Sequence, residues 1–222
     1  FENLHYADFA KESFAVFKRL KAAGKIAPET KFQRIIARGT VVFKDRLWVT
    51  SGEGFTPTEL WSSVDGRNWR LETAELPGRP ESRLVASQDT LWLIAGASGN
   101  PYGTSSEVWK SVDGKAWTQI AQLAPYPPRG FFAAAAFNGR LWVVGGTAAN
   151  SDLNDVWSSA DGATWERNTN AAAFSGRQQH DMVAFNGRLW LSGGFLAPAD
   201  VWSTADGTNW TEETATAAFG LR

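Results

Sequence analysis

The sequence contains no cysteine, and it is poor in other residues that perform chemistry. Its 222 residues include 2 His, 3 Tyr and 1 Met. The absence of cysteine excludes disulfides, thiolate metal sites and a cysteine nucleophile. A two-histidine metal site needs His5 and His180 to converge, and nothing in their spacing indicates this. The sequence therefore predicts no metal and no other cofactor.

Excess charge and long apolar runs are also absent. The net charge is −1, from 22 basic and 23 acidic residues, so bulk charge predicts no binding to nucleic acid or to an anionic membrane. No apolar run approaches the roughly 18 residues that a membrane-spanning helix needs. The composition suits an exported bacterial protein or a cytosolic one, and of the two we favour an extracytoplasmic location.

Tryptophan, by contrast, is abundant and regularly spaced. All 12 tryptophans fall into four units of three. The first column, each preceded by Leu, is Trp48, Trp92, Trp142 and Trp190; the second is Trp61, Trp109, Trp157 and Trp202; the third is Trp69, Trp117, Trp165 and Trp210. The first column recurs after 44, 50 and 48 residues, which is the spacing of a structural repeat.

Two turns repeat on the same grid. The turns before the first column are Lys44-Asp45, Gln88-Asp89, Asn138-Gly139 and Asn186-Gly187, and those before the third are Asp65-Gly66, Asp113-Gly114, Asp161-Gly162 and Asp206-Gly207. Asn-Gly between apolar runs predicts a hairpin, because a type I′ turn needs positive φ at both central residues. A glycine also ends each first-column strand, at Gly52, Gly96, Gly146 and Gly194.

Short apolar runs flank the first turn of each unit. The runs before it are Val41–Phe43, Phe131–Phe137 and Met182–Phe185, and those after it are Leu47–Val49, Leu91–Ile94, Leu141–Val144 and Leu189–Leu191. Each unit therefore predicts four short strands. The sequence indicates an all-β fold, a β-propeller with four four-stranded blades over residues 38–222.

Two of the units resemble a known repeat. The pattern Arg-x7-Phe-Asn-Gly-Arg-Leu-Trp-x2-Gly-Gly, over 129–146 and again over 177–194, resembles the kelch repeat of bacterial propellers, a repeat that the central domain of galactose oxidase also has. The first two units match less well. That enzyme's copper site uses a cysteine-linked tyrosine, which a chain without cysteine cannot assemble.

The segments 63–69, 111–117, 159–165 and 204–210 resemble the Asp-box hairpin of sialidases, with one residue missing between Asp and Gly. We interpret the motif as structural. The aspartate can accept hydrogen bonds from its own turn, the glycine takes positive φ, and the tryptophan covers the hairpin. A motif that recurs in every unit does not mark one active site.

The two ends of the chain depart from the grid. Residues 1–37 are predicted to be a helical segment and linker, because 7–23 has an apolar stripe and Gly24 follows as a C-cap. At the other end, Phe219-x-x-Arg222 repeats the spacing of Phe174-x-x-Arg177. We therefore expect an open arc, with the missing blades on a following stretch or another chain. The alternative is a closed ring of four.

Five residues are candidates for binding. Arg79, Arg129 and Arg177 occupy the same repeat position, and a ring of arginines at the channel mouth could hold an acidic sugar. The alternative is that each pairs with a carboxylate or carbonyl of the next blade. Tyr102 and Tyr126 lie in loops, and the loop of Tyr102 is one of the variable ones, where specificity usually resides. His180 is interpreted as a packed or hydrogen-bonded histidine.

No serine lies in a Gly-x-Ser-x-Gly context, and no catalytic residue is predicted. The sequence therefore predicts a non-catalytic binding or scaffolding propeller whose partner is another protein, the missing blades, or an acidic glycan. The alternative is a carbohydrate-active enzyme of the same fold, related to sialic-acid mutarotases or sialidases. Fold alone does not separate the two.

Overall fold

The structure is a computed structural model that describes residues 39–51, 59–77, 82–94, 105–149, 151–195 and 197–218. The predicted helical segment at 1–37 lies outside these residues. The described part of the chain forms sixteen β-strands and no helix. The all-β prediction is therefore confirmed for it.

The strands form four sheets of four. The first blade contains β1 (Thr40–Phe43), β2 (Arg46–Ser51), β3 (Glu59–Ser63) and β4 (Arg70–Thr73); the second contains β5 (Arg83–Ser87), β6 (Thr90–Ile94), β7 (Val108–Ser111) and β8 (Thr118–Ala121); the third contains β9 (Ala133–Phe137), β10 (Arg140–Ala148), β11 (Ser151–Ser159) and β12 (Glu166–Thr169); the fourth contains β13 (Asp181–Phe185), β14 (Arg188–Ser192), β15 (Val201–Thr204) and β16 (Thr211–Thr214).

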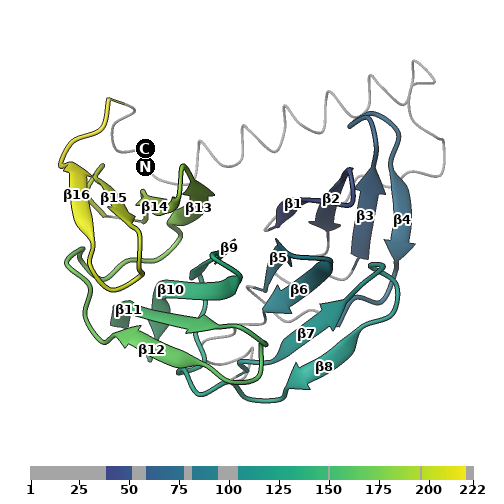
Figure 1. Ribbon diagram of the computed structural model, residues 1–222, viewed down its shortest axis with the longest axis horizontal. Coiled ribbons are helices and arrows are strands. Elements are labelled where there is room, and N and C mark those ends of the chain that lie inside the picture. The colour runs from purple at the N-terminus through teal and green to yellow at the C-terminus, as the bar shows by residue number, and fades with distance from the viewer. Residues whose placement is uncertain are drawn as a thin grey trace, which may run out of the picture.

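Each sheet is an antiparallel meander, with its strands in chain order. The four sheets follow one another around a common centre, with β1, β5, β9 and β13 innermost (Figure 1). The first and fourth blades lie on opposite sides of this centre, so the blades form an open arc (Figure 1). The predicted propeller arrangement is confirmed.

The hairpin turns have the predicted backbone geometry. Asn138 and Gly139 have φ of 50° and 70°, and Asn186 and Gly187 have φ of 48° and 70°. In the turn Lys44-Asp45 both residues also have positive φ. In the turn Gln88-Asp89 the residue with positive φ is Gln88. Three turns therefore have the sign pattern of type I′, which matches the twist of the strands that they join.

The predicted run Phe131–Phe137 begins too early. The strand β9 begins at Ala133. Phe131 has φ of 56°, which is outside the extended region that a strand requires. Its carbonyl oxygen instead accepts a hydrogen bond from the Gln179 amide at 2.8 Å. The residues before β9 thus join the third blade to the fourth.

Each blade has two distinct faces, because side chains alternate along a strand. We call the face with the first-column tryptophan the leading face and the opposite one, with the leucine before that tryptophan, the trailing face. The described core consists of three clusters, and each combines the leading face of one blade with the trailing face of the next. In the cluster between the third and fourth blades, Trp142 and Val144 face Leu189 and Leu191.

The blades interlock through the first-column tryptophans. A Cβ atom on Gly114, Gly162 or Gly207 would overlap the indole of Trp48, Trp92 or Trp142, respectively, from the preceding blade. These three glycines lie in the Asp-Gly turns and have φ of about 70–75°. Each turn thus needs glycine for two reasons, the backbone conformation and the approach of the neighbouring tryptophan.

Candidate functional site

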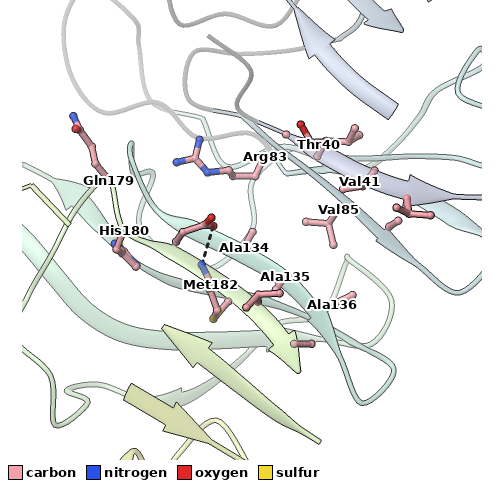
Figure 2. Close-up of a pocket in the computed structure, with 17 residues that line it drawn as sticks. Thr40, Val41, Arg83, Val85, Ala134, Ala135, Ala136, Gln179, His180 and Met182 are labelled. Atoms are coloured by element: carbon pink, nitrogen blue, oxygen red, sulfur yellow. Dashed lines mark hydrogen bonds between the residues drawn. The ribbon is translucent and has the colours of Figure 1, made fainter. Parts of the chain in front are cut away.

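The four innermost strands surround a hollow of about 760 Å³. Its wall consists mostly of small and apolar side chains. Figure 2 shows Ala134, Ala135 and Ala136 of β9 between Val85 of β5 and Met182 of β13. The wall therefore has few charged side chains, of which Arg83 and Asp181 are two.

One charged side chain of the hollow was not predicted. Arg83, at the start of β5, lies at the wall, where its Nε donates to the carbonyl of Phe132 at 2.8 Å and its guanidinium lies 5.6 Å from the Phe132 ring. The other blades have Gly39, Ala133 and Asp181 at this position. Arg83 has no equivalent arginine in the other blades, so the repeat pattern in the sequence offered no indication of it.

His180 also lines the hollow, immediately before β13. The ring is buried, and its Nε2 lies 3.1 Å from the carbonyl oxygen of Val144. Burial, together with the positive charges of Arg177 and Arg83, lowers the pKa of His180 to about 3. The imidazole is therefore neutral near pH 7. The interpretation of His180 as a packed, hydrogen-bonded residue is confirmed.

Two of the three candidate arginines are fully buried and ion-paired. Arg129 binds both carboxylate oxygens of Asp155, at 2.5 and 2.8 Å, and donates to the carbonyls of Gly145 and Pro127. Arg177 binds Asp200 in the same way, at 2.7 and 2.8 Å. The hydrogen bonds from Arg177 and Trp202 hold the pKa of Asp200 below its usual value although burial raises it.

These ion pairs differ from the pairing that the sequence analysis considered. Asp155 lies on β11 of the same blade that Arg129 precedes, not on the next blade. Neither Arg129 nor Arg177 belongs to the wall of the hollow. Arg79 and Tyr102 lie outside the described residues. Ligand binding by the arginines stays a prediction, and the two that are described already have intramolecular carboxylate partners.

The acidic partners belong to a further repeating position, which was not predicted from the sequence. An acidic residue stands two places before each second-column tryptophan: Glu59, Glu107, Asp155 and Asp200. In every blade its carboxylate accepts a hydrogen bond from that indole Nε1, at 2.7 to 3.2 Å. The spacing of acid and tryptophan could have shown this, because it is constant in all four units.

Tyr126 lies in the core and not in an exposed loop. Its ring is buried against Trp157 and Trp165, with centroids 6.1 and 5.0 Å away, and the Arg129 guanidinium lies 5.5 Å from it. Burial raises the pKa of the Tyr126 hydroxyl, so the phenol stays protonated. Tyr126 precedes Arg129 by three residues, as Phe174 precedes Arg177, and this shared spacing was the overlooked indication of its place.

The Asp-Gly turns are structural, as expected. In the fourth blade, Asp206 Oδ1 accepts hydrogen bonds from the amides of Thr208 and Asn209, each at 2.8 Å. These bonds, chiefly that from Asn209, lower the pKa of Asp206 to about 2. The equivalent aspartates of the other three blades have the same two backbone donors. The carboxylates thus hold their own turns.

The leading face of the fourth blade is uncovered. Phe185 is 60% exposed and Val183 is 59% exposed, whereas the equivalent Phe137 and Val85 are 8% and 3% exposed. Trp190 is half-buried, although Trp48, Trp92 and Trp142 are buried. The residue types are those of the internal faces, but this face has no following blade among the described residues.

The trailing face of the first blade is uncovered in the same way. Leu47 and Val49 are half-buried, while the equivalent leucines Leu91, Leu141 and Leu189 are buried. Trp69 and Leu71 are each 40% exposed. A Cβ on Gly66 would meet a single side-chain atom, of Leu47 in its own blade, at 3.5 Å. The arc therefore ends in an apolar leading face and an apolar trailing face. At the three internal interfaces, faces of these two kinds cover each other.

Within the residues that the structure describes, no group of three His, Asp or Glu side chains could hold a metal ion. The same part of the chain has no helix with the length and apolar character needed to cross a membrane.

Comparison with known proteins gives a family for one blade. The Kelch motif family matches residues 128–158, which begin just before Arg129 and end on β11. No curated protein matches the chain. The match and the four blades together support a kelch-repeat propeller. The resemblances to galactose oxidase and to the Asp-box stay predictions.

Proposed function

We propose that the chain is a non-catalytic binding or scaffolding propeller that mediates protein–protein interaction. The observation that supports this most directly is the pair of uncovered end faces. Exposed contiguous apolar surface with buried equivalents elsewhere in the same fold is typical of a protein-binding site. Propellers with kelch motifs are generally protein-interaction modules, which agrees with the motif found in the third blade.

The chemistry of the fourth blade favours a polypeptide partner over a small ligand. Phe185, Val183 and Trp190 lie on one face of a sheet, and polar side chains beside them bond to one another. Arg188, for example, donates to Ser203 Oγ at 2.8 Å, and Ser203 donates to Glu213 at 2.5 Å. A broad apolar surface with satisfied polar neighbours matches the core of a protein interface.

The enzyme alternative requires arginines that can bind a substrate carboxylate. Arg129 and Arg177 have no exposed surface, and each is held bidentately by an aspartate. A sugar carboxylate could reach them only after an ion pair had opened. We therefore propose binding and not sialidase-like or mutarotase-like catalysis, and we place the binding surface on the end faces.

Site-specific cross-linking tests this proposal. A photoreactive amino acid in place of Phe185 is expected to cross-link the chain to another polypeptide in cells that express it. The matched control is the same amino acid in place of Val112, which is equally exposed at 60% but lies on an internal blade. Absence of any cross-linked polypeptide at position 185, or equal yields at both positions, would contradict a binding role for this face.

A further inference from the structure

The interface between the first and second blades brings together two side chains of opposite charge, at positions that recur in every blade. One position lies on the outer strand of the leading face and the other directly follows the turn glycine of the next blade. The residues at the first position are Glu72, Ile120, Asn168 and Glu213, and the residues that follow the turn glycines of the second, third and fourth blades are Lys115, Ala163 and Thr208. Of these residues, Glu72 and Lys115 attract each other across the interface between the first and second blades.

The charged pair belongs to the first and second blades. Burial raises the pKa of Glu72, but hydrogen bonds from Ser62 and Arg70 and the positive charges of Arg70 and Lys115 lower it overall. Lys115 follows the turn glycine of the second blade, so its charge compensates the carboxylate across the interface. The position opposite a glutamate is thus occupied by a cation.

The fourth blade repeats the acidic half of this pair. Glu213 accepts a hydrogen bond from Ser203, just as Glu72 accepts one from Ser62. The residue that follows the turn glycine of the first blade is Arg67, which is exposed. Arg188 of the same blade lies 3.7 Å from Glu213, just as Arg46 lies 3.9 Å from Glu72, which has Lys115 as an additional cation from the next blade. The uncovered leading face therefore presents a glutamate that lacks this additional cation, and the uncovered trailing face presents one in Arg67.

Two further contacts form at internal interfaces, and the residues equivalent to their two partners lie on the two uncovered end faces. Thr73 Oγ1 donates to the carbonyl of Gly114 at 2.5 Å across the first interface, and Thr214 and Gly66 occupy these positions at the two ends. Trp190 stands where the other blades place an indole against a turn glycine, and Gly66 is the turn glycine that has no indole against it. Charge, hydrogen bonding and shape thus agree.

Within one chain these two faces do not meet, because the first and fourth blades lie on opposite sides of the hollow (Figure 1). A second copy supplies the missing face. We propose that the leading face of the fourth blade binds the trailing face of the first blade of a second copy of this chain, with Glu213 facing Arg67 and Trp190 seated against Gly66. This proposal rests on the proposed function and names its partner.

Such a contact is head-to-tail. Two different surfaces meet, so the assembly closes if a second equivalent contact forms and grows if it does not. Two copies bring the number of blades to about eight, the upper end of what propellers contain. The two end blades of one copy already lie on opposite sides of the hollow. A closed ring of two copies therefore requires each arc to open more widely. If the arcs keep their present curvature, further copies bind end to end and form longer assemblies.

The mass of the purified full chain in solution tests the proposal. Sedimentation velocity over a concentration series is expected to show a species of at least twice the 24.3 kDa of one chain. Phe185→Glu, on the leading face, is expected to reduce the mass to that of one chain. So is Gly66→Ala combined with Arg67→Glu, on the trailing face. Val112→Glu, on an internal blade, should leave the assembly intact.

Mixing the two interface variants tests the head-to-tail geometry. Each variant alone lacks one half of every contact, whereas an equimolar mixture retains one intact contact. The mixture is therefore expected to form a one-to-one pair that does not grow. If the contact joined two identical faces instead, the variant altered on the other face would still form dimers by itself. Circular dichroism of each variant shows whether it remains folded.

Two outcomes overturn the proposal. One is a wild-type chain that stays at 24.3 kDa throughout the series. The other is an assembly that both interface variants leave unchanged, since it then uses a different surface. If the wild-type chain is a monomer while position 185 still cross-links to a different polypeptide, the second-copy proposal fails and the proposed protein-binding function stands.

Discussion

Arg129→Ala is expected to lower the free energy of unfolding by about 3–5 kcal/mol, the cost typical of breaking a buried ion pair. The substitution leaves the Asp155 carboxylate largely buried and removes the donor to the carbonyls of Gly145 and Pro127. Urea unfolding followed by tryptophan fluorescence measures the change. If the arginine instead serves a ligand, its removal should leave stability nearly unchanged and reduce binding.

A surface ion pair of the same blade provides the control. Arg140 binds Glu166 at 2.8 Å, with side chains 30% and 67% exposed. Arg140→Ala is expected to cost less than about 1 kcal/mol, because water screens an exposed pair. The double substitution Arg129→Met and Asp155→Leu should recover much of the lost free energy of unfolding, because no unpaired charge then remains in the core. Equal losses for Arg129→Ala and Arg140→Ala would contradict the structural role.

Gly207→Ala is expected to have the second largest effect, a loss of about 2–4 kcal/mol from positive φ and overpacking together. The residue has φ of 75°, and its added Cβ would overlap the indole of Trp142 from the preceding blade. Either the turn or the tryptophan must move, which opens the contact between the third and fourth blades. Thermal or urea unfolding of the variant measures the loss.

Gly66→Ala is the matched control for the interlock. It lies in the same turn, with φ of 69°, but its Cβ would meet only Leu47 at an ordinary distance. We expect a loss of about 1–2 kcal/mol from the backbone conformation alone, at a dilution where the chain is monomeric. If the two variants lose the same amount, the seating of Trp142 against Gly207 does not stabilise the fold.

The sequence was sufficient to predict the blades because their turns are local. Asn138-Gly139 defines its hairpin through the conformations that two residues adopt, and Asp206 holds the next turn through amides two and three residues away. Tryptophan spacing then set the number of strands in each unit. These features depend on neighbours in the chain, so they are readable without a structure.

The site was less predictable because its residues act through distant partners. Arg129 was recognised as a repeated residue, but its partner Asp155 is far along the chain, and only the structure brings them together. Arg83 faces the hollow without any repeated counterpart. The exposure of Phe185 depends on whether another blade follows in space, which residue type alone does not reveal, since Phe137 is buried at the same position.

The most direct test of this account compares the solvent exposure of the four first-column tryptophans. Hydroxyl-radical footprinting with mass spectrometry, at a dilution where the chain is monomeric, measures their oxidation rates. We predict that Trp190 is oxidised faster than Trp48, Trp92 and Trp142, because only the face of Trp190 lacks a following blade in the described part of the chain. Protection of Trp190 equal to that of Trp142 in the monomer would contradict the open arc and its binding face.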